Sequence, residues 1–360
     1  MPTDRVAAFS IELTRYLDAD GHVLGPMPDF AANAADLIPL YRAMVLTRAF
    51  DAKAVALQRT GRLGTFASSL GQEAVGVGAA SAMATDDILV PSFRDQGAQL
   101  WRGVTPVELL LYWGGDERGS DFAGPRGDFP ISVPVGSHVP HAAGAALVMK
   151  LRHEAHAVLS IIGDGATSKG DFYEALNVAG VWSLPLVVLI SNNQWAISVP
   201  RSAQSAAATL AQKAIAAGLP GEQVDGNDVI AVRACVARAL ARARSGDGAS
   251  LIEALTYRLS DHTTSDDARR YRDDAEVSAH WHGEPIARLR QYLVSQGVWT
   301  RDDEEQVLAR AAAEIDRAAE AYLATPPQPV SAMFDHLFAK LPASLAAQRA
   351  RAVAEAADDA

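Results

Sequence analysis

The sequence has one cysteine, Cys235, among its 360 residues. One cysteine forms no intrachain disulfide and no CxxC metal site, and this usage suits a reducing compartment, so we expect a cytoplasmic protein. Lys and Arg are also few, 32 against 43 Asp and Glu, which gives a formal net charge of −11. This acidic balance argues against nucleic acid or an anionic membrane surface as a partner.

Long apolar runs are absent. The most apolar stretch covers only residues 184–190, whereas a helix that spans a bilayer needs about 20 such residues. The first 21 residues mix acids with apolar residues and contain no apolar core with a cleavage site, so we expect no signal peptide. Hydrophobic residues make up 49% of the chain and charged residues 21%, which indicates a globular protein.

Short apolar runs at 157–162, 186–191 and 251–257 alternate with segments of helical pattern at 142–151, 169–182, 206–217 and 229–243. This alternation predicts an α/β fold in which a parallel sheet is covered by helices on both faces. Helical patterns also cover 35–60 and 71–83. We expect an N-terminal extension (1–33), one α/β domain (34–275), a helical C-terminal region (276–345) and a tail (346–360) that frays or serves as a contact arm.

The residues best suited to bind a ligand are Gly163-Asp164-Gly165, which follow the first of these apolar runs. Ligands of open parallel sheets bind at the carboxyl ends of strands, and the free N–H groups of the helix that follows suit a phosphate group. Asp164 adds a carboxylate, a ligand that suits Mg²⁺. The segment therefore predicts a site for Mg²⁺ and phosphate.

Asn193 follows the next apolar run, 193 − 164 = 29 positions after Asp164. That distance is one strand–helix–strand passage, so both side chains should reach the same edge of the sheet. Each motif alone is a common turn, and two turns without a metal are the alternative. No GxGxxG follows a strand, and residues 163–170 lack the Gly-Lys-Ser/Thr order of a P-loop.

At these residues the sequence resembles the thiamine-diphosphate enzymes, and more narrowly the alpha subunit of the decarboxylating component of 2-oxo acid dehydrogenase complexes. The resemblance runs from about residue 40 to about residue 341, and it implies the diphosphate-binding half of the thiamine-diphosphate fold. The segments that carry it are SLGQEAVGVG, PSFRDQG, LLYWGGDERG, PVGSHVPHAAGAA, GDGATSKGDFYEALN, NNQWAISVP, VDGNDV and TYRLSDHTTSDDARRYR.

The resemblance implies thiamine diphosphate and Mg²⁺ as cofactors. The metal ligands would be Asp164, Asn193 and the main-chain carbonyl of Trp195. His262 matches a loop histidine near the diphosphate and the reacting carbon, and it is the candidate catalytic residue. The remaining cofactor-binding positions implied by the match are Phe93, where relatives often have Tyr, the diphosphate-binding Arg94, Val133 and Val135 beside the aminopyrimidine, and Gly165 and Ala166 at the diphosphate.

Two further polar side chains lie in the segments that carry the resemblance. We expect Glu73 to be a capping or packing carboxylate without a chemical role. His138 would point at the site if the loop before it holds the cofactor, but we expect it to cap a helix or lie at the surface.

Enzymes of this family also need a glutamate beside the aminopyrimidine ring, which belongs to a second sheet domain. This chain shows only one such sheet, so the resemblance implies a beta subunit that completes the site, in a heterotetramer of two alpha and two beta chains. It further implies oxidative decarboxylation of a 2-oxo acid and transfer of the acyl group to a lipoyl arm on an acyltransferase core.

The sequence indicates the substrate less specifically than it indicates the family. LLYWGGDERG and PVGSHVPHA look most like bacterial pyruvate dehydrogenase alpha subunits, so pyruvate is the expected substrate. The segment after His262 also resembles branched-chain 2-oxo acid dehydrogenases, and acetoin is a third possibility. Two further hypotheses are a non-catalytic assembly paralogue and a different Mg²⁺-dependent phosphate enzyme that uses Asp164.

Overall fold

The computed structural model describes residues 3–335 and 337–358. They belong to two compact units, one that ends at Ala319 and one that begins at Glu320. The tail lies in a helix up to Asp358, the expectation that it frays or serves as a contact arm stays a prediction, and residues 359 and 360 lie outside the described residues. No described helix is both long and apolar enough to cross a membrane.

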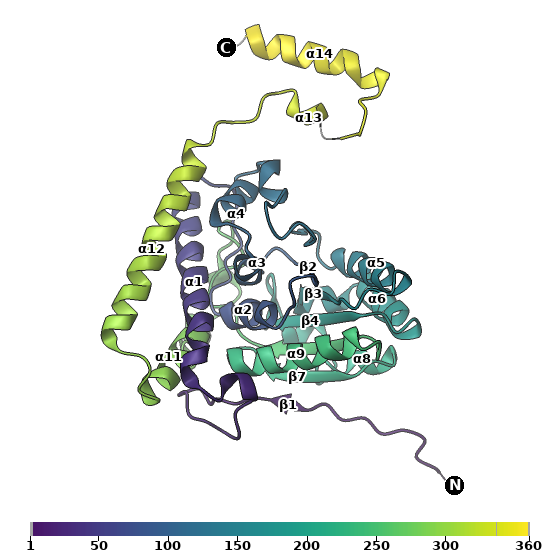
Figure 1. The fold of residues 1–360 in the computed structure, drawn as a ribbon, viewed down its shortest axis with the longest axis vertical. Coiled ribbons are helices and arrows are strands. Elements are labelled where there is room, and N and C mark those ends of the chain that lie inside the picture. The colour runs from purple at the N-terminus through teal and green to yellow at the C-terminus, as the bar shows by residue number, and fades with distance from the viewer. Residues whose placement is uncertain (1–2, 336, 359–360) are drawn as a thin grey trace. The chain divides into compact units, whose positions relative to one another are not determined.

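The centre of the first unit is a six-stranded, fully parallel sheet (Figure 1), as the apolar runs predict. Its spatial order is β1-β7-β8-β4-β3-β2, and a short antiparallel pair, β5 and β6, lies outside it. The strands are β1 (Leu13–Thr14), β2 (Ile88–Val90), β3 (Val158–Gly163), β4 (Leu186–Asn192), β5 (Trp195–Ala196), β6 (Val199–Pro200), β7 (Gly221–Asp225) and β8 (Ser250–Leu255).

Helices account for most of the remaining regular structure. Five short 3-10 helices lie at 29–31, 34–37, 117–120, 164–168 and 268–270, and the fourth of them is labelled η4 (Asp164–Ser168). The α-helices are α1 (Ile38–Arg59), α2 (Glu73–Ser81), α3 (Gln96–Arg102), α4 (Pro106–Trp113), α5 (His138–Leu151), α6 (Gly170–Val181), α7 (Arg201–Gln204), α8 (Lys213–Ala216), α9 (Val229–Arg244), α10 (Asp274–His280), α11 (Pro285–Ser295), α12 (Arg301–Ala324), α13 (Ala332–Asp335) and α14 (Ala343–Asp358).

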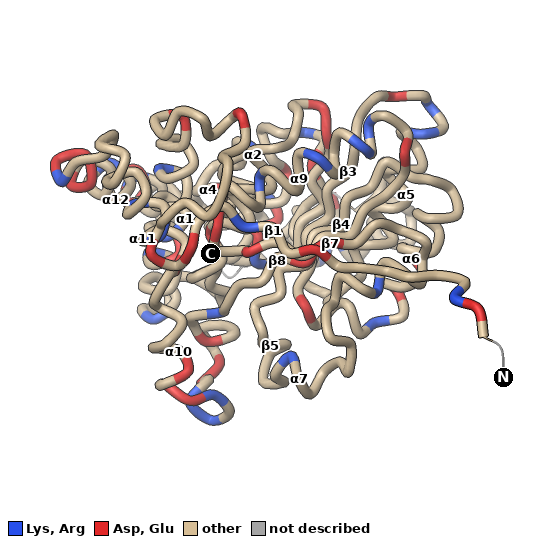
Figure 2. Tube along the Cα trace, turned by 90° about the horizontal axis from the view of Figure 1, so that it is seen from below, with Lys and Arg blue, Asp and Glu red and all other residues tan. Residues whose placement is uncertain are grey.

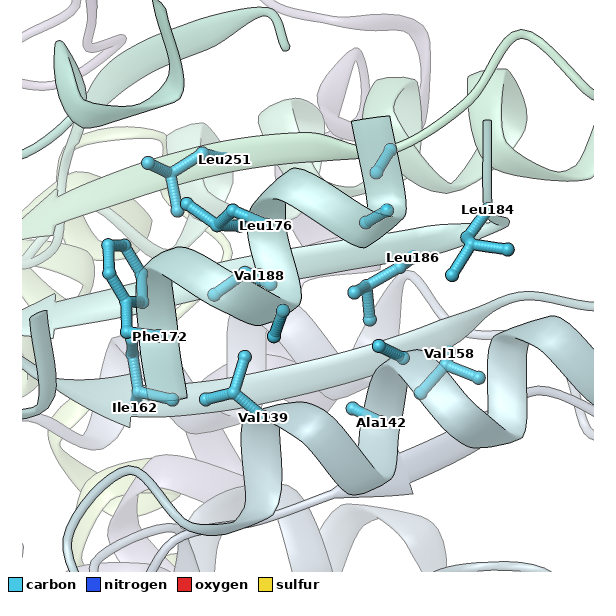
Figure 3. Close-up of a cluster of buried hydrophobic side chains, with 14 of the residues drawn as sticks. Val139, Ala142, Val158, Ile162, Phe172, Leu176, Leu184, Leu186, Val188 and Leu251 are labelled. Atoms are coloured by element: carbon cyan, nitrogen blue, oxygen red, sulfur yellow. The ribbon is translucent and has the colours of Figure 1, made fainter. Parts of the chain in front are cut away.

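Both faces of the sheet are buried under helices, and alternate residues of each strand point to opposite faces. Val158 and Ile162 of β3 pack with Val139 of α5 and Phe172 of α6 on one face, which Figure 3 shows in close-up. Leu159 and its neighbours pack on the other face with α2, α3 and α9. Two-sided burial explains why the central strands read as continuous apolar runs.

The predicted helix over 206–217 is wrong, because only the short helix α8 forms there. The main-chain N–H groups of Leu210 and Ala211 donate to the buried carboxylate of Glu253 at 2.7 and 2.9 Å, and are therefore not used in a helix. Strand β7 was not predicted, because its sequence GEQVD contains no apolar run. Within the extension 1–33, β1 pairs with β7.

The register of β3 and β4 sets the position of the predicted site. Gly163, the last residue of β3, pairs with Ser191 of β4. Both strands are parallel, so the turns that follow them, with Asp164 and Asn193, leave the same edge of the sheet.

Candidate cofactor and metal site

Asp164 is the first residue of η4 and is only 1% exposed. Its Oδ2 has no hydrogen-bond partner among the described residues. Burial raises the pKa of this carboxyl to about 6, against the opposing charge of Arg258 and Arg201. A buried acceptor without a partner is costly, so this oxygen is open to a ligand from outside the described residues.

Asn193 lies in a tight turn after β4 and is 5% exposed. Its Oδ1 accepts the main-chain N–H of Trp195 at 3.2 Å, and its Nδ2 donates to Oε1 of Gln72 at 3.0 Å. Positive φ angles at Gln194 (72°) and Ile197 (58°) bend the chain back toward the sheet edge. The Trp195 carbonyl accepts from Nη1 of Arg258 at 3.2 Å and keeps a second lone pair.

A cavity of about 200 Å³ opens beside these turns. Eight of the predicted site residues line it, namely Phe93, Arg94, Val135, Gly165, Ala166, Asn193, Trp195 and His262. Val133 is not among the lining residues and is 53% exposed, whereas Asp164 lies between Gly163 and Gly165, which both line the cavity. A Cβ at Gly165 would lie 2.9 Å from the Cβ of Ala196, which is too close, so this part of the cavity wall has room only for glycine.

Arg94 and His262 form one cluster at the cavity wall. Nη2 of Arg94 donates to the carbonyl of His262 at 2.9 Å and to its Nδ1 at 3.1 Å, and Nη1 donates to the carbonyl of Ser68. The ring of Phe93 meets the imidazole edge-on, with centroids 6.0 Å apart. The hydrogen bond to Nδ1 assigns the proton of a neutral imidazole to Nε2.

The protonation of His262 follows from its surroundings. Burial lowers the pKa of this imidazole to about 4, and the charges of Arg94 and Arg258 contribute to the same shift. Burial lowers the pKa of Arg94 as well, to about 10. Near neutral pH the imidazole is therefore uncharged, and the guanidinium is a cation suited to an anionic ligand.

The surrounding positive charge is local rather than a property of the whole surface. Arg258 is fully buried and donates to the carbonyls of Trp195 and Ile197 and to the hydroxyl of Tyr271. Along the whole trace, basic and acidic residues are interspersed (Figure 2). The charges of Arg94 and Arg258 act on the same site, since both lower the pKa of His262.

Three further cavity residues were not predicted to take part in the site. Gln72, His138 and Gln204 each carry a buried polar atom (Nε2, Nδ1 and Oε1) with no partner among the described residues. The expectation that His138 lies at the surface or caps a helix is wrong, because it is 3% exposed and donates through Nε2 to the carbonyl of Ile161 at 2.9 Å. Gln72 stands in the GQEA motif, and His138 follows the loop expected to hold the cofactor, which were the signals in the sequence for these two residues.

Glu73, beside this cavity, has a structural role, as expected. It accepts from Nε of Arg48 at 2.7 Å and from the main-chain N–H of Gly71 at 3.0 Å, and Arg48 also pairs with Glu284. Its carboxylate is thus satisfied within the protein.

The donor set is suited to a hard divalent cation. Asp164 offers a free carboxylate oxygen, Asn193 an amide oxygen and Trp195 a carbonyl oxygen. Mg²⁺ prefers such oxygen ligands and commonly completes its shell with water and phosphate oxygens. The unpartnered oxygen of Asp164 therefore fits the metal implied by the sequence.

Comparisons with known proteins identify the family of the chain. A family model described as "Dehydrogenase E1 component" matches residues 41–331. The chain is 45% identical over 318 residues to the 3-methyl-2-oxobutanoate dehydrogenase subunit alpha of Mycobacterium tuberculosis, covering 88% of this chain and 87% of the relative. It is 38% identical over 342 residues to the pyruvate dehydrogenase E1 component subunit alpha of Staphylococcus epidermidis, covering 94% and 91% respectively.

Proposed function

The chain belongs to the dehydrogenase E1 component family, and on this basis we propose that it is the alpha subunit of a 2-oxo acid dehydrogenase that binds thiamine diphosphate through Mg²⁺. The observation that carries the proposal is the unpartnered Asp164 oxygen at the sheet edge that also holds Asn193. Asp164, Asn193 and the Trp195 carbonyl would hold the metal, and Arg94 would bind the diphosphate.

Thiamine diphosphate, when bound, supplies the nucleophile and the electron sink for loss of CO₂ from a 2-oxo acid. The protein binds and orients the cofactor, and His262 offers the Nε2–H of a neutral imidazole to the reacting groups. A donor at this position can orient the substrate or move a proton during acyl transfer to a lipoyl group.

The proposed partner is a beta subunit. Among the described residues that line the cavity, Asp95 holds the only carboxylate, and it is engaged by the main-chain N–H and the hydroxyl of Ser92. A glutamate for the aminopyrimidine would therefore come from another chain. Val133 and Val135, on the loop at the cavity, and Ile197 and Val199, on the neighbouring turn, are 41–53% exposed, which suits a surface that a partner covers.

Two substrate classes are candidates. The 45% identity to a branched-chain enzyme, against 38% to a pyruvate enzyme, favours 3-methyl-2-oxobutanoate. Pyruvate is the second candidate, because several segments of the sequence resemble pyruvate enzymes. One methylene in an apolar pocket discriminates by about 1–3 kcal/mol, so turnover separates the two acids.

The test uses the chain co-expressed and purified with a candidate beta subunit from the same organism. We would follow reduction of an artificial electron acceptor with 3-methyl-2-oxobutanoate and with pyruvate, with and without thiamine diphosphate and Mg²⁺. Cofactor-dependent turnover is expected, and the higher kcat/KM identifies the substrate. Cofactor binding without turnover of either acid would point to another oxo acid, to acetoin or to an assembly role, and failure to bind would refute the proposal.

A further inference from the structure

Lys213, the first residue of α8, is a buried cation near the site that the proposed function does not use. It is 8% exposed, and no carboxylate among the described residues forms an ion pair with it. Its Nζ donates to the carbonyl oxygen of Thr167 at 2.7 Å and to the hydroxyl oxygen at 3.1 Å. The Thr167 hydroxyl in turn donates to the carbonyl of Asp164 at 2.8 Å. The ammonium therefore supports both ends of η4.

The residues just before Lys213 support the other turn. Glu253 of β8 is 1% exposed, and its Oε2 accepts the main-chain N–H groups of Leu210 and Ala211. Its Oε1 accepts from Nδ2 of Asn192 at 2.7 Å, and Oδ1 of Asn192 accepts the main-chain N–H of Gln194 at 3.2 Å. These bonds shape the turn that presents Asn193.

We propose that residues 210–213 position both metal-bearing turns, with Lys213 holding the Asp164 turn and Glu253 linking the segment to the Asn193 turn. This inference rests on the proposed function. The segment supplies no ligand, but it joins two turns that come from different strands. The ammonium has no ionic partner among the described residues, but it lies 5.2 Å from the ring centroid of Tyr173 and 6.0 Å from that of Phe172, which offsets part of its burial cost. Its two hydrogen bonds hold Thr167, three residues after the proposed ligand Asp164. Lys213 is thus a positioning residue.

The matched control is Lys150 of α5. The side chain of Lys150 is exposed, whereas that of Lys213 is buried, and Nζ of Lys150 donates to the main-chain carbonyls of Trp182 (2.5 Å) and Ser183 (3.3 Å), at the end of α6 away from the site. Lys213→Met and Lys150→Met therefore remove the same kind of contact in two places. Lys213→Arg keeps the charge and the donors, and Glu253→Gln weakens the link to Asn192.

The experiment titrates the assembly of alpha and beta chains with Mg²⁺ at fixed thiamine diphosphate and follows cofactor binding by quenching of tryptophan fluorescence. Loss of a residue that supports a ligand typically weakens metal binding by about tenfold to a hundredfold. We expect that loss for Lys213→Met, with kcat at saturating Mg²⁺ and cofactor within about twofold of the parent. Lys213→Arg should restore most of the Mg²⁺ affinity, and Lys150→Met should leave it unchanged.

An unchanged Mg²⁺ affinity in Lys213→Met, or an equal loss in Lys150→Met, would overturn the inference. If Lys213→Met does not assemble, Glu253→Gln provides the test, because an unchanged Mg²⁺ affinity in Glu253→Gln would also overturn the inference. Asp164→Ala keeps the two proposals distinct. If it loses Mg²⁺ binding while Lys213→Met does not, only the positioning role fails, and if it keeps Mg²⁺ binding, the proposed function fails.

Discussion

Two buried aspartates at opposite edges of the sheet differ in what meets their carboxylates. Asp87, just before β2, is 2% exposed, accepts the main-chain N–H groups of Ala84 (2.8 Å) and Ala157 (2.9 Å), and pairs with Arg244. Asp164, just after β3, is 1% exposed but keeps one oxygen without a partner among the described residues.

The difference separates a carboxylate whose oxygens are satisfied within the protein from one with an oxygen open to a ligand. At the amino edge the buried charge is compensated inside the protein, whereas at the carboxyl edge the compensation is incomplete. Burial alone does not separate the two residues, but the count of satisfied oxygens does. The predictions below change one edge at a time.

The strongest change that we expect is the loss of ligand binding in Asp164→Ala. Removing this oxygen should weaken Mg²⁺-dependent binding of thiamine diphosphate on the order of a thousandfold, beyond the loss typical of residues that only support a ligand. The Tm without cofactor should stay equal or rise, because a buried carboxylate with an unmet oxygen is removed. Calorimetric titration measures the affinity, and a thermal melt measures the Tm. A lower Tm with unchanged affinity would show that Asp164, like Asp87, has a structural role and is not a ligand.

His262→Ala separates chemistry from binding at the same edge. Acyl transfer to a lipoyl acceptor should fall by about 10²-fold or more, within the range typical of a side chain that transfers protons. Affinity for the cofactor should change by less than about threefold, because Arg94 keeps its bond to the Ser68 carbonyl. A large loss of cofactor affinity, measured by fluorescence titration, would contradict a role in the reaction.

Asp87→Ala should have the reverse signature. It leaves Arg244 and two main-chain N–H groups without their acceptor, so we expect the free energy of unfolding to drop by about 3 kcal/mol. Cofactor affinity should not change. Chemical denaturation measures the loss, and Glu305→Ala, which breaks an exposed pair with Arg301, is the control with an expected cost below about 1 kcal/mol.

Asp51 of α1 is an intermediate case, and its replacement should have the weakest effect. Its oxygens accept only uncharged donors, the hydroxyl of Ser68 at 2.5 Å and the main-chain N–H of Ser69 at 2.6 Å. Burial raises its pKa from 3.8 to about 6. The folded state therefore binds more protons than the unfolded state between these values, and the stability from this group is lost as pH rises through about 6.

Asp51→Asn should remove this contribution. The free energy of unfolding, measured by chemical denaturation at pH 4, 5, 6 and 7, should fall less steeply with pH in the variant than in the parent. The two falls should differ by at most about 3 kcal/mol over this pH range. The same slope in both proteins would show that Asp51 is already ionised at pH 4.

Much of the fold could be predicted from local pattern. The continuous apolar runs predicted the central strands, and eight of the residues expected at the cofactor line one cavity, whereas Val133 and Asp164 are not among its lining residues. The roles assigned to Asp164, Asn193 and His262, and the domain boundaries, stay predictions. The helix expected over 206–217 failed because Glu253, about 40 residues later in the chain, takes the main-chain N–H groups that a helix would use.

Sequence pattern was enough to place Asp164 and Asn193 at the same edge of a parallel sheet, because each closes an apolar run and one strand–helix–strand passage separates them. The packed structure was needed to show which oxygen lacks a partner, that Arg94 contacts His262, and that Lys213 supports Asp164 through Thr167. These contacts join distant parts of the chain. They depend on how helices and loops pack around the sheet, which no local periodicity encodes.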